Sequence, residues 1–145
     1  MLEMGKSVLY KMYADLVLAL EPIAGKGLVF LNNRPSTKAD DLPMRHFMVI
    51  ALPVSISDTV IGGNRTLLNT SGVVYVYTQS RSDNTLDVNA AGDLIDAVCD
   101  AFPIKGKSVV ATNPTPQTQG PDKWGFQVTA ITFDLRGRWR AFEDN

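Results

Sequence analysis

Three carboxylates are the side chains whose spacing most suggests chemistry. Asp93, Asp96 and Asp100 recur at steps of three and four residues, which places them on one stripe of a helix. We call them the acidic stripe. Their oxygens suit a metal ion or a basic partner, but charged stripes most often face water, so we favour a solvated face over partner contact.

Three guanidinium groups near the end of the sequence form a second pattern. Arg136, Arg138 and Arg140 alternate, so in a continued strand they project to one side, with Trp139 on the other. Three cationic side chains in a chain of net charge -1 are too few to indicate nucleic-acid binding, so we favour an acidic protein surface as the partner of these arginines. We hypothesise that the acidic stripe of a neighbouring subunit meets this arginine row, with charge pairing setting register more than affinity.

The chain has one histidine and one cysteine, which limits catalytic and metal chemistry. An intrachain disulfide, a zinc site built on paired cysteines and a multi-histidine metal centre are excluded, whereas a carboxylate-only site stays open. His46 opens an apolar strand, and we interpret it as a partly buried residue bonded to backbone. Cys99 is interpreted as a small buried hydrophobe, because nothing in its local sequence lowers the pKa of a thiol.

Length and composition predict one domain over residues 1–145. The chain has 145 residues, of which 45% are hydrophobic and 20% are charged, as in soluble globular proteins. Its apolar runs are shorter than the roughly 20 residues needed to span a bilayer. The first residues show no secretory signal pattern, so we expect synthesis and folding inside the cell.

Two amphipathic helices are expected to position the acidic stripe and cover a sheet. Apolar residues recur at helical spacing over residues 8–20, with Ser7 as a cap and Pro22 as a stop. The second helix is expected to begin near Asp87, a good cap, and to end before Pro103. Its inward-facing residues are predicted to be Val88, Ala91, Leu94, Ile95, Val98 and Phe102.

Five apolar segments are predicted as strands, and one pair of short segments is predicted as a hairpin. The hairpin joins Val60 and Ile61 to residues 66–68 through a glycine-rich turn. Residues 113–122 contain three prolines and are predicted as a loop, as are residues 32–43. The expected strands span residues 28–31, 46–52, 71–79, 109–112 and 124–135.

These elements predict an α+β fold: a mostly antiparallel sheet of about five or six strands, with two helices packed on one face of it. The strand at residues 46–52 and the segment 73–76 are apolar on both faces, although two helices cover only one. Additional strands or a symmetric subunit contact would cover the second face, and closed rings are a common outcome of such contacts.

The order and hydrophobic pattern of these segments resemble the tailed-bacteriophage tail terminator family, also called tail-completion or minor tail protein U-like proteins. The resemblance covers about residues 6–140 and rests on patterns without a catalytic signature. The segments that carry it, after an N-terminal helix, are Val29-Phe30-Leu31-Asn32-Asn33-Arg34-Pro35, Arg45-His46-Phe47-Met48-Val49-Ile50-Ala51-Leu52-Pro53, Ser71-Gly72-Val73-Val74-Tyr75-Val76-Tyr77, Ala90-Ala91-Gly92-Asp93-Leu94-Ile95-Asp96-Ala97-Val98-Cys99-Asp100-Ala101-Phe102-Pro103 and Trp124-Gly125-Phe126-Gln127-Val128.

The resemblance implies a structural protein of a phage or prophage. Such a subunit often forms a sixfold ring that caps the growing tail tube, stops its polymerisation and presents a surface to the head-side connector. Its implied partners are copies of itself, the tail tube protein and the head–tail connector protein, with no membrane and no specific nucleic acid. No enzyme activity and no cofactor are implied. The expected location is the host cytoplasm during assembly and then the tail or neck of the virion.

Two polar segments are the candidate contact surfaces for the tube or a neighbouring neck protein. They span residues 55–64 and 113–122, and surface loops without any partner are an equally good interpretation of them. The candidate contact residues in and beside them are Asp58, Asn64, Arg65, Gln117, Gln119 and Lys123.

Two other functions remain open at the level of the sequence. Another neck component, such as a head–tail adaptor or stopper, would share the setting and the size of a terminator. A small-molecule binding protein or enzyme would use the same α+β layers with a pocket between sheet and helices, and its convergent polar groups are not visible in the sequence.

Overall fold

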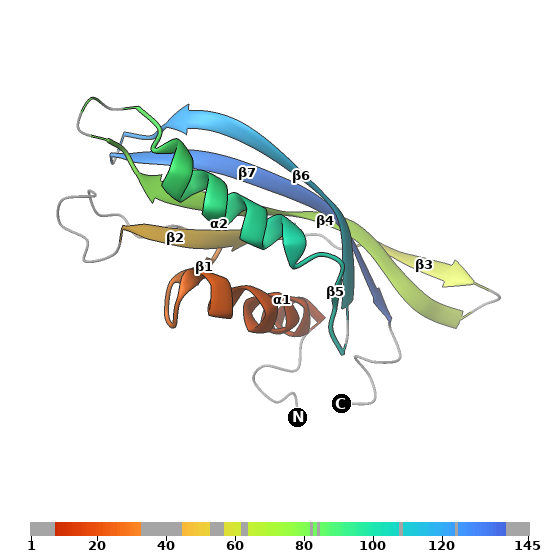
Figure 1. Cartoon of the computed structure of the whole chain (residues 1–145). Coiled ribbons are helices and arrows are strands. Elements are labelled where there is room, and N and C mark those ends of the chain that lie inside the picture. The colour runs from red at the N-terminus through yellow and green to blue at the C-terminus, as the bar shows by residue number, and fades with distance from the viewer. Residues whose placement is uncertain are drawn as a thin grey trace.

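A seven-stranded sheet carries two helices on one face (Figure 1). The computed structural model describes residues 8–32, 45–52, 57–61, 64–81, 83, 85–107, 109–123 and 125–138. The elements in chain order are α1 (Val8–Ala24), β1 (Val29–Leu31), β2 (His46–Ala51), β3 (Ser57–Ile61), β4 (Asn64–Gln79), α2 (Val88–Asp100), β5 (Ile104–Lys105), β6 (Val109–Pro121) and β7 (Phe126–Arg138).

The strands follow the order β1-β2-β4-β7-β6-β5, and β3 pairs with β4 beside β2. Only the β1–β2 pair is parallel among the pairs described, and the others are antiparallel. The predicted α+β class with two helices on one face is therefore confirmed. The short β5 is the strand that the sequence does not predict, and β4 unites residues 66–68 of the predicted hairpin with the strand predicted at residues 71–79.

The central ladder joins β4 to β7 in unbroken register from Leu67↔Arg138 to Gln79↔Phe126. Successive side chains of a strand point to opposite faces. Ile131, Phe133 and Leu135 accordingly belong to the core beneath the helices, while Phe126 belongs to a cluster on the other face. This division of β7 into two faces is as the alternation predicts.

The main core lies between the helices and the sheet. In α1, Met12, Leu16 and Leu20 have no exposed surface, and their spacing by four residues forms one helical stripe. They pack in one cluster with Val98 of α2 and with inward residues of the sheet. The hydroxyl of Tyr13 also accepts a hydrogen bond from the Leu52 backbone N–H at 3.1 Å, which ties α1 to the end of β2.

The sheet face opposite the helices carries a separate aromatic cluster. Phe47 and Phe126 have no exposed surface there. Phe47 stacks on Tyr77 with ring centroids 4.5 Å apart, and Phe126 meets Phe47 edge to face at 5.0 Å. Phe30 of β1 meets Phe47 edge to face at 5.6 Å. The prediction that the strand at residues 46–52 is covered on both faces is therefore confirmed.

The helix ends follow capping chemistry with one correction. Asp87 caps α2 as predicted, because its side chain accepts from the Ala90 backbone N–H at 3.2 Å. Pro22 was expected to stop α1, and this is wrong because the helix continues to Ala24. Pro22 removes one N–H but does not end the last turn of the helix. The residue that follows the helix is Gly25, whose positive φ of 112° is a conformation that glycine adopts without strain.

Two further expectations are corrected by the pairing of the strands. Residues 113–122 are not a loop, since β6 continues to Pro121 along β7. Its three prolines are tolerated because this stretch borders no further strand among the described residues and the ladder shifts register twice. Residues 57–61, inside the expected 55–64 loop, form β3, as the hairpin prediction requires.

Val88 is the fourth correction, since 68% of its surface is exposed instead of facing inward. The residue is the first of α2, and Ala91 and Val98 form the buried side of that helix. Leu94, Ile95 and Phe102 are partly buried against the core, as predicted.

Two glycine substitutions test how tightly the central ladder packs. A Cβ at Gly72 would lie 2.6 Å from the Phe133 ring and 2.7 Å from Leu52, whereas a Cβ at Gly92 in α2 meets nothing within 4 Å. We expect Gly72→Ala to lower the free energy of unfolding by about 1–3 kcal/mol through overpacking. Gly92→Ala should raise it by up to about 1 kcal/mol through helix propensity.

The measurement is urea denaturation followed by circular dichroism at a low protein concentration. Gly92→Ala is the matched control, because both substitutions add one methyl group. An equal change in the two variants would contradict the packing described around Gly72.

Candidate functional site

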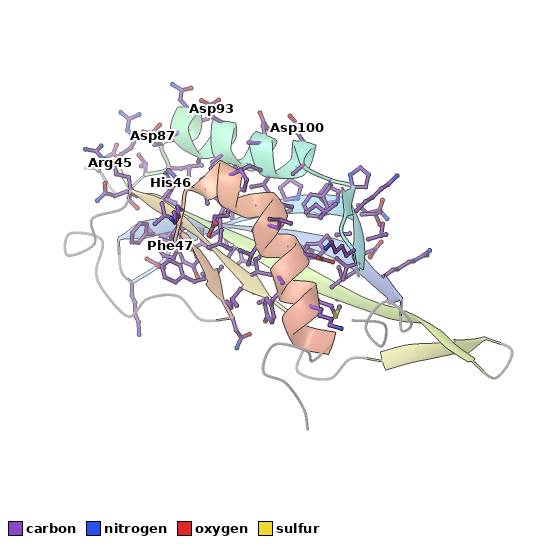
Figure 2. All side chains as sticks on the ribbon, turned by 90° about the horizontal axis from the view of Figure 1, so that it is seen from below. Arg45, His46, Phe47, Asp87, Asp93 and Asp100 are labelled. Carbon is purple, nitrogen blue, oxygen red and sulfur yellow. The ribbon has the colours of Figure 1, made fainter. Side chains whose placement is uncertain are left out.

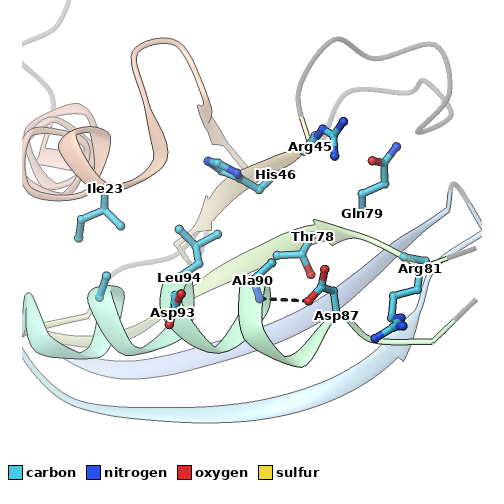
Figure 3. A pocket seen from close by; sticks show the side chains of 12 residues that line it. Ile23, Arg45, His46, Thr78, Gln79, Arg81, Asp87, Ala90, Asp93 and Leu94 are labelled. Carbon is cyan, nitrogen blue, oxygen red and sulfur yellow. Dashed lines mark hydrogen bonds between the residues drawn. The ribbon is translucent and has the colours of Figure 1, made fainter.

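A pocket of about 690 Å³ opens where the end of α1, the start of β2, the end of β4 and the first half of α2 meet (Figure 3). Its lining mixes apolar side chains with polar and charged ones. The residues that line it are Ile23, Arg45, His46, Thr78, Gln79, Ser80, Arg81, Asp87, Ala90, Asp93, Leu94 and Ala97.

His46 is held by backbone in this pocket, as the sequence predicts. Its Nε2 donates a hydrogen bond to the Ala24 carbonyl at 2.8 Å, and the side chain is half-buried. The bond links the start of β2 to the end of α1. Because this ring nitrogen is engaged, His46 acts here as a structural link between the two elements.

The charges around the pocket balance one another. Arg45 and Arg81 are exposed, and Figure 3 shows them on the side of the pocket where β2 begins and β4 ends. Asp87 is occupied as the helix cap, and Asp93 is exposed on α2. The lining therefore contains two guanidinium groups and two carboxylates, so the site suits a ligand or partner side chain of mixed polarity more than a strong anion.

The acidic stripe lies on the outer side of α2, away from the sheet. Asp93, Asp96 and Asp100 are exposed, while Ala91 and Val98 on the opposite side of the helix are buried (Figure 2). Within the described part of the chain, no group of three His, Cys, Asp or Glu side chains lies close enough to hold a metal ion. The stripe is therefore an exposed anionic surface.

Arg136 lies on the other face of the molecule from the acidic stripe. It is exposed and adjoins Leu135, which is buried beneath the helices, so alternation directs Arg136 away from them. Arg138 is the last residue of β7, and its side chain lies outside the described structure, as do Trp139 and Arg140. Arg136 and the acidic stripe therefore point to different faces of one chain, and the pairing of the arginine row with the stripe between subunits stays a prediction.

The candidate contact residues separate to opposite ends of the central ladder. Asp58 lies in β3, and Asn64 and Arg65 open β4, at the hairpin that extends from one end of the sheet (Figure 1). Gln117, Gln119 and Lys123 are exposed on β6 and on the turn before β7, at the other end. The 13 residues of β7 span about 40 Å between these ends, so the two sets form two surfaces.

Sequence reasoning missed the pocket, although the sequence carries a signal for it. Arg45 directly precedes one predicted strand, and Arg81 follows shortly after another. When such strands pair antiparallel, the residue before the first and the residue after the second lie at the same end of the sheet. The observed register of His46↔Thr78 places them so.

The thiol of Cys99 sits half-buried in α2 and is not activated. Burial, followed by the nearby carboxylates of Asp96 and Asp100, raises the pKa of the Cys99 thiol above its ordinary value. This agrees with the interpretation of Cys99 as a packing residue. In addition, no helix among the described residues is long and apolar enough to cross a membrane.

Comparison with known proteins identifies the fold. A protein chain in the virion of the native gene transfer agent (GTA) particle matches over 93% of this chain and 94% of its own, with a TM-score of 0.52 and 16% identity. A second solved structure matches over 94% of this chain and 98% of its own, with a TM-score of 0.61 and 12% identity. No protein-family model and no curated protein matches. At these identities the likeness establishes a shared fold.

The raised pKa of Cys99 predicts slow alkylation. A thiol whose pKa is raised holds less thiolate at a given pH, so iodoacetamide should modify the folded chain more slowly at pH 7.5 than the chain unfolded in urea. The rate in the folded chain should still be rising where the rate of the unfolded chain levels off. Equal rates, or a plateau at the same pH in both states, would contradict this environment for the thiol.

Proposed function

We propose that this protein is a structural component of a phage or phage-like particle, and that it acts there as a tail terminator. In this role it caps the tail tube, stops its polymerisation and forms the surface that joins the tail to the head. The observation that carries the proposal is the fold shared, over nearly the full length of both chains, with a chain of the gene transfer agent virion. The resemblance of the sequence to tail terminators gives the finer assignment.

The layout of the surfaces supports a ring subunit. The hairpin of β3 and β4 and the turn between β6 and β7 lie about 40 Å apart, at the two ends of the central ladder. A subunit that contacts a tube on one side and a connector on the other needs two such separate ends. We propose that the candidate contact residues Asp58, Asn64 and Arg65 serve one partner and that Gln117, Gln119 and Lys123 serve the other.

The arrangement of polar groups supports a role without catalysis. In the pocket described above, His46 is engaged with the Ala24 carbonyl, and Asp87 is engaged with the Ala90 N–H. Cys99, the only cysteine, has a raised pKa, which disfavours the nucleophilic thiolate. We therefore propose that the protein works through contacts with other proteins, with no cofactor. As a tail terminator it would be found in the host cytoplasm during assembly and then in the virion.

The 690 Å³ pocket favours a second candidate, the binding of a small molecule of mixed polarity. A head–tail adaptor or stopper is the nearest alternative within the virion. The two classes differ in one measurable property, since a neck protein assembles with itself or with tubes and a ligand-binding protein has no need to.

Light scattering across protein concentrations, with electron microscopy of any assembled fraction, tests the proposed function. We expect a ring, with six subunits as the implied number, either alone or after addition of tail tubes from the cognate particle. Tubes that grow in the absence of the protein should stop at a uniform length in its presence. A chain that stays monomeric with tubes present, and leaves their length unchanged, would overturn the assignment.

A further inference from the structure

A second groove lies on the helix layer, between the outer side of α1 and the segment that follows α2. Its volume is about 630 Å³, and Ala14, Leu18, Ala101 and Pro103 supply apolar parts of its lining. Leu18 is 78% exposed, more than any other large hydrophobic side chain in the described residues. An apolar side chain this exposed in the lining of a groove suits contact with another protein.

The groove is built into the fold. A Cβ at Gly106 would lie 2.5 Å from the carboxyl group of Asp15, so the turn between β5 and β6 sits directly on α1. A glycine at this position permits the close approach. In addition, Pro22 has no N–H, so the usual helical hydrogen bond from residue 22 to the Leu18 carbonyl is not made.

The rim of the groove is basic. Lys105 and Lys107 both line it and are exposed. Asp15 is the acidic side chain of the lining, and it lies against the turn that carries the two lysines. An apolar floor with a cationic rim fits an apolar side chain accompanied by carboxylates.

The exposed side of α2 has this complementary chemistry. Val88 is 68% exposed, which is second only to Leu18 among the large hydrophobic side chains described. The acidic stripe follows on the exposed part of the same helix. Val88 and Ala101, which lines the groove, are separated by the 13 residues of α2, or about 20 Å. The two surfaces therefore cannot meet within one chain.

We propose that the groove around Leu18 receives the exposed side of α2 from a second copy of this chain, with Val88 against Leu18 and the acidic stripe beside Lys105 and Lys107. The contact buries the two most exposed large apolar side chains of the described structure and pairs opposite charges. It joins two different surfaces, so it is head-to-tail, as a ring requires. The inference rests on the proposed ring and specifies the contact between neighbouring subunits within it. The partner of the acidic stripe in this contact is Lys105 and Lys107, and not the arginine row that the sequence suggested.

Disulfide trapping between two singly substituted proteins tests the contact. Leu18→Cys and Val88→Cys are each made in a Cys99→Ser background, mixed under conditions where the ring forms, and oxidised. We expect a cross-linked dimer in the mixture and none in either protein alone, because the proposed contact brings position 18 of one copy within disulfide reach of position 88 of the next and brings neither position near its own copy. Asp96→Cys mixed with Arg136→Cys is the matched control for the arginine-row pairing.

Charge reversal provides a second readout that does not depend on cysteine geometry. Asp96→Lys should raise the concentration needed for half-assembly about fivefold, as expected for the loss of a rim ion pair. Adding Lys107→Glu to the same chain should restore assembly, whereas adding Arg136→Glu should not. All the substituted side chains are exposed, so folding is expected to be preserved.

The outcomes separate the two proposals. Rings that form without a Leu18–Val88 cross-link, or whose charge-reversed variant is rescued by Arg136→Glu, overturn this contact and leave the terminator assignment standing. A chain that forms no assembly even with tubes overturns both. A cross-link together with rescue by Lys107→Glu supports the contact.

Discussion

The pairing of β4 with β7 is the constraint on which the other features depend. Thirteen residues of each strand run in register, and Gly72 opposite Phe133 leaves room for the aromatic ring where Leu52 also packs. Because the ladder is unbroken, the alternation of side chains is preserved along its whole length. It therefore assigns Phe133 to the helix-covered core and Phe126 to the aromatic cluster on the other face. A slip of one residue would exchange these two faces.

Features that depend on periodicity within one segment were predictable from the sequence. The spacing of Met12, Leu16 and Leu20 identifies the buried side of α1, and Asp87 identifies the start of α2. The continuous apolar run of β2 predicts burial on both faces, because in a strand open to solvent on one side apolar residues would alternate with polar ones. In each case, the environment of a residue is set by neighbours only a few positions away.

Features that depend on which elements meet were not predictable in the same way. The prolines of residues 113–121 predict a loop, and they are accommodated in β6 only because this strand lies outside β7 with a free outer edge among the described residues. Val88 follows the apolar pattern of α2 but sits at its first turn, beyond the sheet that would bury it. The groove around Leu18 likewise exists because a turn distant in sequence lies on α1. The environments of these residues depend on which elements pack together, and a local sequence pattern does not contain that information.

The distribution of charge and apolar surface favours one mode of self-association over another. A twofold dimer whose axis passes through the acidic stripe, or through Lys105 and Lys107, would bring like charges to close range, and this opposes binding. A head-to-tail contact instead places the stripe beside cations. Such contacts close into a ring when the rotation between subunits permits, and extend into a filament when it does not. A closed ring would leave the sheet ends with the β3–β4 hairpin and the β6–β7 turn available for two different partners, which is the geometry a joint between a tube and a connector requires.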